Sequence, residues 1–413
     1  MRIVWVTENE ISPMQGGTER ITATLATAFM ARGHECVSLC FRPCTFREKT
    51  AFSVKYLLDV ERHIGRAAFV HKRGSAMEAL EDRLSSAVAD ADVVVCNLVD
   101  IRYKRLLLPM LYSLTRASGA RLLSCYHAMP GEELIGTPLR NCLWHIRRRE
   151  RVSHYLREAV LTLVPRSVLL ALRGKYIRSR YTLMRDNSDK VVLLSERFMP
   201  LFAALSGNPD TGGLTAVPNA LSFDGFMGED GLADKRKEIL IVSRLDEKAK
   251  RLSSTLEIWS RVKHDGWRLV IVGGGPDEEY YRRMALRLHL RDVAFEGRQP
   301  DLMPYYRRAS IFMMTSAFEG WGITLTEAQQ NGVVPIAYES YASLRDIIED
   351  GVNGVVVPYR KRRLYVKGLR RLMRDDKARR RMSLAAVDSS RRFSVDEVVG
   401  QWERLFVSGV VEE

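Results

Sequence analysis

The chain has 413 residues, 46% hydrophobic and 28% charged, which predicts two soluble globular domains and excludes disordered, collagen-like and disulfide-stapled proteins. Only six cysteines, no run of about 18 apolar residues, and acidic Glu8 and Glu10 near the start indicate a cytoplasmic protein without a signal peptide or membrane span. The formal net charge of +14, from 64 Lys and Arg against 50 Asp and Glu, indicates an anionic partner.

Strands alternate with helices along the first half of the chain. Apolar runs predict strands at residues 2–7, 37–41, 93–96, 121–126 and 191–194. Helical spacing of apolar residues predicts helices at residues 19–31, 76–89 and 105–117. This alternation predicts a parallel sheet with helices on both faces, the doubly wound α/β fold.

A second series of the same kind follows. Its predicted strands are residues 238–242, 268–272, 293–296, 311–314, 333–338 and 354–357, and its predicted helices are residues 252–263, 277–288, 301–308 and 323–331. Because Gly, Asp, Asn and Pro accumulate between Gly207 and Asp234, we place one Rossmann-like domain at residues 1–215 and a second at 216–393. We expect a last helix, at about 394–413, to pack back on the first domain. Ligands of such folds bind at the carboxyl ends of the strands, here in a cleft that the two domains face.

The strongest local signal lies after the predicted strand 311–314. Glu319 is followed by two glycines and then by a helix that carries Glu327. Free N–H groups at a helix start favour a phosphate, and carboxylates accept hydrogen bonds from sugar hydroxyls. The pattern therefore favours a diphosphate-sugar site over the alternative of one capping and one solvated acid.

Two further loops supply candidate anion-binding groups. Arg244 and Lys250 follow the predicted strand 238–242, and an Arg with a mobile Lys is suited to a diphosphate, although a charge run of this kind is commonly a solvated loop. Gly16 and Gly17 open the first helix but lack the third glycine of a dinucleotide fingerprint, which argues against nicotinamide cofactors. For Gly273–Gly275 a tight turn is a sufficient explanation.

Among the histidines, His127 lies at the carboxyl end of the strand 121–126, where a ligand contact and a satisfied histidine are equally compatible with the sequence. Asp90 and Asp92 have the spacing of a metal site but precede their strand, so we assign them to a turn. No zinc-binding spacing occurs in the sequence. We therefore expect no metal.

Together these motifs resemble the retaining glycosyltransferases of the GT-B fold, specifically family 4, which builds bacterial polysaccharides and glycolipids. The segments that carry the resemblance are Gly16–Arg20, Arg32–Glu35, Pro218–Ser222, Ser243–Leu245 with Lys250, Glu319 with Glu327, Asn331–Pro335 and Asp346–Gly354. They cover nearly the whole chain, and their order and spacing are specific.

The resemblance implies roles for individual residues. It implies Arg244, Lys250, Glu319 and His127 as catalytic residues: the cations neutralise a diphosphate, and Glu319 and His127 contact the transferred sugar. The donor-binding residues that it implies are Gly16, Gly17, Arg244, Lys250, Arg298, Glu319, Gly322, Ile323, Thr324 and Glu327, with Glu327 on the ribose and Arg298 near the base.

Two departures from the family pattern are Trp321, where a smaller residue is common, and the extra residue before Lys250, which makes Lys248 a competing candidate. No cofactor is implied, because the nucleoside-diphosphate sugar is a substrate.

The acceptor is expected to be a glycan or a lipid-linked glycan. Residues 139–180 hold 11 Lys and Arg against 2 acids, and residues 359–392 hold 14 against 3. In the first block Arg147–Arg151 adjoin an apolar segment too interrupted to span a bilayer, so we expect peripheral attachment to the inner face of the cytoplasmic membrane, with an ordinary solvated face as the alternative.

Rival functions are a nucleotide-sugar epimerase or phosphorylase on the same fold and a nucleic-acid-binding protein. Few aromatic residues are interleaved with the charges, so no nucleic-acid partner is expected.

Overall fold

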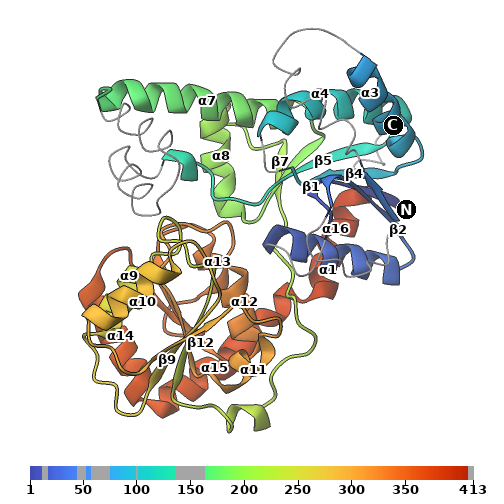
Figure 1. Ribbon diagram of the computed structural model, residues 1–413. Coiled ribbons are helices and arrows are strands. Elements are labelled where there is room, and N and C mark those ends of the chain that lie inside the picture. The colour runs from blue at the N-terminus through green and yellow to red at the C-terminus, as the bar shows by residue number, and fades with distance from the viewer. Residues whose placement is uncertain (12–16, 44–52, 57–74, 99–100, 135–162, 408–413) are drawn as a thin grey trace. The chain divides into compact units, whose positions relative to one another are not determined.

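The protein is described by a computed structural model that covers residues 1–11, 17–43, 53–56, 75–98, 101–134 and 163–407 (Figure 1). The chain divides into two compact units. One contains Met1–Gly131, Leu172–Ser222 and the residues from Ser394 onward, and the other is built around Phe223–Phe393. The first unit extends past the expected boundary at residue 215 because β7 (Leu214–Ala216) is a strand of its sheet.

The first unit contains a seven-stranded sheet in the order β3-β2-β1-β4-β5-β6-β7, in which every neighbouring pair is parallel. Its other strands are β1 (Arg2–Asn9), β2 (Glu35–Arg42), β3 (Ser53–Tyr56), β4 (Val93–Cys96), β5 (Arg121–Tyr126) and β6 (Lys190–Leu193). The central strands are buried almost throughout. Strands covered on both faces need continuous apolar runs, which is why the sequence predicts them.

Helices cover this sheet on both faces. The helices described in this half of the chain are α1 (Gly17–Ala31), α3 (Ser75–Val88), α4 (Ile101–Ser118), α7 (Arg166–Asp186) and α8 (Met199–Ser206), with short 3-10 turns η1 (Glu132–Leu134) and η2 (Glu196–Phe198). The last helix, α16 (Val395–Val407), packs beside α1 (Figure 1). Its Trp402 ring lies 6.3 Å from that of Trp5, and Arg32 at the end of α1 forms a 2.7 Å ion pair with Glu403.

The second unit contains a six-stranded parallel sheet in the order β10-β9-β8-β11-β12-β13. Its strands are β8 (Glu238–Val242), β9 (Arg268–Val272), β10 (Val293–Gly297), β11 (Ile311–Met314), β12 (Val334–Glu339) and β13 (Val355–Pro358). Its helices are α9 (Leu252–Trp259), α10 (Glu278–Arg287), α11 (Met303–Arg308), α12 (Ile323–Gln330), α13 (Leu344–Ile347), α14 (Arg362–Arg374) and α15 (Asp376–Ser390), with turns η3 (Asp230–Leu232) and η4 (Arg391–Phe393). The predicted fold class is confirmed, because each unit is a doubly wound parallel α/β fold.

Two helical regions differ from the sequence-based expectation. The helix expected at residues 252–263 ends at Trp259, because the chain turns there and the Trp259 ring stacks on His264 at 4.0 Å. Residues 359–392, to which we assigned no element from the sequence, contain α14 and α15. The buried side of α14 consists of Tyr365, Val366, Leu369, Leu372 and Met373, which have the spacing of an amphipathic helix.

Among the described helices, none has both the length and the apolar character needed to cross a bilayer.

Candidate donor-binding site

The second sheet has its topological switch point between β8 and β11. Strand order runs outward from β8 to β9 and β10 on one side, and from β11 to β12 and β13 on the other. Loops that leave adjacent strands in opposite directions open a crevice at the carboxyl edge, where ligands of such sheets bind. The loop after β8 carries Arg244 and Lys250, and the loop after β11 carries Glu319. The fold therefore brings the principal predicted residues to one edge.

Asp246 organises the loop after β8. One of its carboxylate oxygens accepts a 2.7 Å hydrogen bond from the Arg244 guanidinium, and the other accepts a 2.9 Å bond from the backbone N–H of Lys248. Asp246 is almost fully buried, whereas 65% of the Arg244 side chain is exposed. Asp246 thus orients the Arg244 guanidinium, and because most of the side chain is exposed the guanidinium stays accessible to an anion.

Glycines in the loop after β9 let that loop pack closely against the loop after β8, which carries Arg244. A Cβ atom at Gly273 would overlap the carbonyl oxygen of Ser243, and Gly273 has a φ of +132°, which disfavours any other residue. A Cβ at Gly275 would lie 2.6 Å from the backbone nitrogen of Leu245. The sequence predicts only a tight turn for these glycines. The structure shows that they also allow close packing against the loop that carries Arg244.

The central contact of the site joins two loops that are distant in sequence. Lys250 Nζ donates to Glu319 Oε1 at 2.6 Å, and the Ser316 hydroxyl donates to the same oxygen at 2.7 Å. The side chains of Lys250 and Glu319 are 23% and 12% exposed, and both line a small pocket. Within the part of the chain that the structure describes, Glu319 Oε2 has no hydrogen-bond partner, so it can accept one from a sugar hydroxyl.

Lys248 differs from Lys250 in its surroundings. The Lys248 side chain is exposed, and the hydrogen bond to Asp246 involves only its backbone. Lys250 is the member of the pair that reaches Glu319. The geometry therefore favours Lys250 as the cation of the site.

The start of α12 lies next to this pair. Gly322 precedes the helix with a φ of +96°, and a Cβ atom there would lie 2.9 Å from the buried Tyr341 hydroxyl. Burial, and secondly the nearby Glu319 carboxylate, hold the pKa of Tyr341 well above its usual range. Ile323 and Thr324 are partly exposed in the first turn, where N–H groups without helical partners favour an anion.

Glu327, the second carboxylate of the motif, has a different environment. Its side chain is fully buried, and the Tyr306 hydroxyl donates a 2.9 Å hydrogen bond to Oε2. A ribose hydroxyl would reach this carboxylate only after neighbouring groups move. The sequence pattern places Glu327 on the correct helix but does not reveal its burial.

The remaining donor-site candidates of the second unit lie around the same edge. Arg298 follows β10 and is exposed, and its side chain lies over Gly274, where an added Cβ would approach Arg298 Cγ to 3.0 Å. Trp321 is buried against Phe393 with ring centroids 5.2 Å apart. Its ring therefore packs in the core of the second unit.

His127 and Gly17 belong to the first unit. His127 follows β5 and lines a small pocket with Asn97 and Thr22, whose side chains are joined by a 2.9 Å hydrogen bond. Gly17 is the first residue of α1, and Gly16 lies outside the described residues.

Within the described residues, no cluster of three or more His, Cys, Asp or Glu has the arrangement of a metal site. Asp90 and Asp92 accept hydrogen bonds from the side chain and backbone of Arg2, at 3.1 and 2.6 Å. These carboxylates therefore fix the start of β1.

Three residues of the site escape sequence reasoning: Asp246, Ser316 and Tyr306. Asp246 and Ser316 lie two and three residues from Arg244 and Glu319, a spacing from which local support could have been inferred. Tyr306 is 21 residues from Glu327, so no local signal identifies it.

Lys235 joins the two elements that hold Glu327. Its ammonium donates to the carbonyl of Tyr306 in α11 at 2.8 Å and to that of Asn331, after α12, at 2.6 Å. Burial lowers the pKa of Lys235 from 10.5 to about 7. This cation is thus held by neutral carbonyls in a poorly hydrated place.

This environment predicts a pH-dependent stability. Below pH 7 Lys235 is protonated in both states, whereas between about pH 7 and 10 the folded state binds fewer protons, so stability rises with pH. The free energy of unfolding of the wild type minus that of Lys235→Met should therefore increase over this interval, by at most about 1.4 kcal/mol per pH unit. Urea unfolding at pH 6, 7, 8 and 9 measures the difference. Lys237→Met, at an exposed neighbour, is the control, and a difference that stays constant with pH contradicts the assignment.

Comparison with known proteins supports this picture over part of the chain. Residues 224–388 match the family model of glycosyl transferases, group 1. An amylovoran biosynthesis glycosyltransferase, AmsD of Erwinia amylovora, is 26% identical over 222 residues, which are 53% of this chain and 62% of that protein. An exopolysaccharide phosphotransferase of Streptomyces coelicolor is 30% identical over 222 residues, 53% of this chain and 23% of that protein. The matched region thus spans less than two thirds of either relative.

Solved structures share the whole fold. Anabaena HepE in complex with UDP and glucose superimposes with a TM-score of 0.71 at 15% identity, covering 99% of this chain and all of that one. TarM superimposes with a TM-score of 0.68 at 12% identity, covering 98% of this chain and 99% of that one. Residues 224–388 thus resemble group 1 glycosyl transferases, and the shared architecture shows that the chain has the same two-unit fold as these solved structures.

Proposed function

We propose that this protein is a retaining glycosyltransferase of family 4 that moves a sugar from a nucleoside-diphosphate sugar to a hydroxyl of a glycan or glycolipid acceptor. The observation that carries the proposal is the 2.6 Å contact between Lys250 and Glu319 at the switch point of the second sheet. It places a cation suited to a diphosphate beside a carboxylate suited to sugar hydroxyls. The complex of the structural neighbour HepE with UDP and glucose supports a nucleotide sugar as donor.

In this proposal the cations stabilise the leaving group. Arg244 is exposed at the carboxyl edge, and Lys250 uses one N–H for Glu319, which leaves two for phosphate oxygens. The N–H groups of Gly322, Ile323 and Thr324 add a fixed positive potential at the start of α12. Because these charges already stand in place, little reorganisation is needed as the diphosphate departs.

Glu319 orients the transferred sugar. Its Oε1 is held by Lys250 and Ser316, so Oε2 is directed by two fixed hydrogen bonds and accepts from a sugar hydroxyl. The bond between the anomeric carbon and the phosphate oxygen breaks, and the acceptor oxygen bonds to the same face of that carbon. The acceptor proton passes to the departing phosphate, so this scheme calls on no metal and no covalent enzyme intermediate.

The other site residues have supporting roles in the proposal. Glu327 holds the ribose once Tyr306 or its neighbours move, and Arg298 lies near the base. His127, Gly16 and Gly17 are proposed as further donor contacts, as the family resemblance implies. The position of His127 supports this proposal. His127 follows β5 at its carboxyl end, and doubly wound sheets bind their ligands at that edge.

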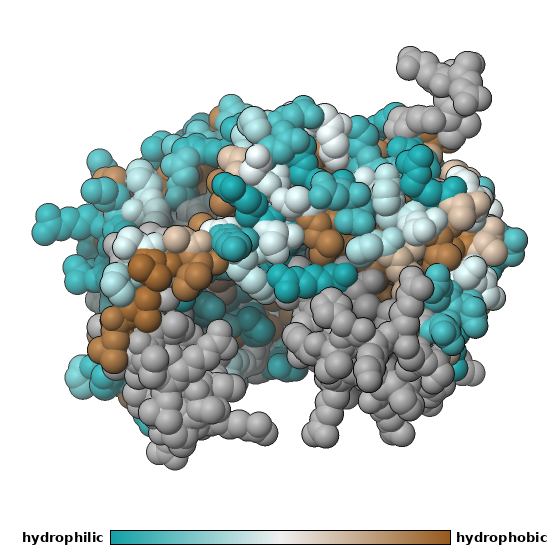
Figure 2. Space-filling view, turned by 90° about the horizontal axis from the view of Figure 1, so that it is seen from above, coloured by the Kyte–Doolittle hydropathy of each residue, from teal (hydrophilic) through white to brown (hydrophobic). Residues whose placement is uncertain are grey.

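We further propose a role in bacterial cell-surface polysaccharide biosynthesis, such as that of lipopolysaccharide or capsule, at the inner face of the cytoplasmic membrane. The name of the AmsD relative supports the polysaccharide. Arg147–Arg151 lie outside the described residues, but α7 exposes Val168, Leu172 and Tyr176 at successive helical turns. Figure 2 looks down on this helix and shows hydrophobic residues among hydrophilic ones on that face. Such an arrangement suits a helix that lies on a membrane.

A screen of nucleotide sugars tests the proposed donor site. A ligand that binds only the folded state raises the unfolding temperature, so at least one nucleoside-diphosphate sugar should stabilise the wild type. Arg244→Ala should lose most of this stabilisation. If neither the sugars nor the free diphosphates of uridine, guanosine, adenosine, cytidine and thymidine raise the unfolding temperature, the proposal fails.

A further inference from the structure

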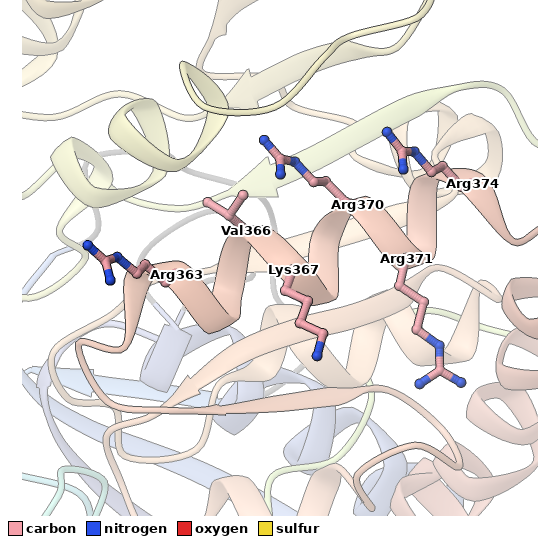
Figure 3. A pocket seen from close by; sticks show the side chains of 6 residues that line it. All are labelled: Arg363, Val366, Lys367, Arg370, Arg371 and Arg374. Carbon is pink, nitrogen blue, oxygen red and sulfur yellow. The ribbon is translucent and has the colours of Figure 1, made fainter.

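The outer side of α14 carries a continuous row of cations. Tyr365, Leu369 and Leu372 bury one side of this helix in the core of the second unit. The opposite side forms the cationic face of α14, which lines a shallow hollow and consists of Arg363, Lys367, Arg370, Arg371 and Arg374. Figure 3 shows Arg363, Arg370 and Arg374 pointing to one side of the helix and Lys367 and Arg371 to the other.

Within the described residues, the cations of this face have no carboxylate partner. Of these cations, only Arg370 has a hydrogen bond in the described part of the chain, to the Arg261 carbonyl at 2.5 Å. Nine other arginines of the same unit do pair with a carboxylate: Arg244, Arg282, Arg283, Arg308, Arg345, Arg362, Arg379, Arg380 and Arg391. Like charges three and four residues apart destabilise a helix, so the face carries an electrostatic cost that an anionic partner would relieve.

The charged surface extends beyond the helix. A second hollow shares Arg370 and Arg374 with the first and adds Lys237 and Lys263 from neighbouring elements. Its two carboxylates are Asp265 and Asp376, of which Asp376 pairs with Arg379. The partner of this surface must therefore present several negative charges over a broad area.

The composition of the surface indicates how a partner is recognised. Among the described residues, neither hollow is lined by Ser, Thr, Asn or Gln, and the one aromatic ring, Trp267, is buried. Sugars and nucleotide bases are bound through directional hydrogen bonds and exposed aromatic rings, which this surface does not offer. Its occupant is therefore selected by charge density alone.

We propose that the cationic face of α14 docks on a bilayer that contains anionic phospholipid. A bilayer is broad and carries regularly spaced phosphates, and charge density suffices for its recognition. Because the apolar side of α14 is committed to the core, contact is electrostatic and nothing is inserted. None of its residues belongs to the block 139–180, and the proposal does not rest on the proposed reaction.

Vesicle sedimentation tests the proposal. The wild type should bind vesicles of 30% phosphatidylglycerol in phosphatidylcholine at low salt, ignore pure phosphatidylcholine, and dissociate at about 0.3 M salt. Each cation near such a surface contributes about fivefold in affinity. The variant Arg363→Gln, Lys367→Gln, Arg371→Gln and Arg374→Gln should therefore require at least about 100-fold more anionic lipid for half-binding through this surface.

The matched control removes four exposed cations elsewhere in the second unit: Arg236, Arg287, Arg291 and Arg307. It has the same net charge as the α14 variant and should bind within a few-fold of wild type. Circular dichroism and unfolding temperature confirm that both variants fold. Equal losses in both variants, or wild-type binding by the α14 variant, would overturn the proposal. So would a wild type that binds soluble polyphosphate through these residues but does not sediment with the vesicles.

Discussion

Replacing Lys250 with Met is expected to lower turnover by about 10²- to 10³-fold, the loss typical of removing one preorganised group that stabilises developing charge. Lys250 lies on the same loop as Arg244 and forms an ion pair with Glu319. Its side chain is only 23% exposed. A charge in such a poorly hydrated place interacts more strongly with a phosphate than it would in water. Affinity for the free nucleoside diphosphate should fall by about 1.5 to 3 kcal/mol. Turnover assays and calorimetry measure these two effects.

Lys248→Met is the matched control for this variant. Lys248 is exposed two residues away, and its side chain has no contact with Glu319 in the described structure, so turnover should remain within a few-fold of wild type. Lys250→Met also leaves the Glu319 carboxylate without its ion-pair partner. The double variant with Glu319→Gln removes that stranded charge, so its unfolding temperature separates a loss of fold from a loss of function. If Lys248→Met is the damaging variant and Lys250→Met is silent, the assignment is reversed.

Glu319→Gln is expected to lower turnover by about 10²-fold while nucleoside-diphosphate binding is retained or tightens. The amide keeps the size of the side chain but removes a negative charge 2.6 Å from Lys250 Nζ. That charge competes with a phosphate for Lys250, so its removal frees the lysine for the diphosphate. The sugar, in contrast, loses the carboxylate oxygen that accepts from its hydroxyl. Separate measurement of kcat and of diphosphate affinity distinguishes the two effects.

Glu327→Gln provides the comparison for Glu319→Gln. Glu327 is fully buried and bonded by Tyr306, so its replacement should weaken both diphosphate binding and turnover. The opposite pattern, with binding lost in Glu319→Gln and kept in Glu327→Gln, would show that the two carboxylates have exchanged roles.

The parallel strands could be predicted well because they are covered on both faces and therefore consist of continuous apolar runs. β8, β9 and β11 begin and end where the sequence places them. α14 could also have been predicted, because Tyr365, Val366, Leu369, Leu372 and Met373 have the spacing of an amphipathic helix, although from the sequence we assigned residues 359–392 only their positive charge. The early end of α9 depends on the stacking of Trp259 on His264, a tertiary contact.

The same distinction between local sequence signals and tertiary contacts applies to the candidate site. Glycines and charges at the ends of strands predict that Arg244, Lys250 and Glu319 meet at one edge, since parallel strands share a carboxyl side. Which lysine reaches Glu319 depends on a contact across 69 residues, and local spacing cannot specify it. Local sequence likewise cannot predict that Glu327 is buried beneath Tyr306, because this burial depends on how α11 and α12 pack.

Product analysis with the stabilising nucleotide sugar tests the central claim most directly. Wild-type protein is incubated with that sugar, with and without an acceptor fraction extracted from membranes, and the products are separated and examined by NMR. We predict that nucleoside diphosphate is released in an acceptor-dependent manner and that the transferred sugar keeps its anomeric configuration. Lys250→Met should lower the rate at which both products form by about 10²- to 10³-fold. An isomerised nucleotide sugar formed without acceptor, a requirement for inorganic phosphate, or an inverted linkage would contradict the account.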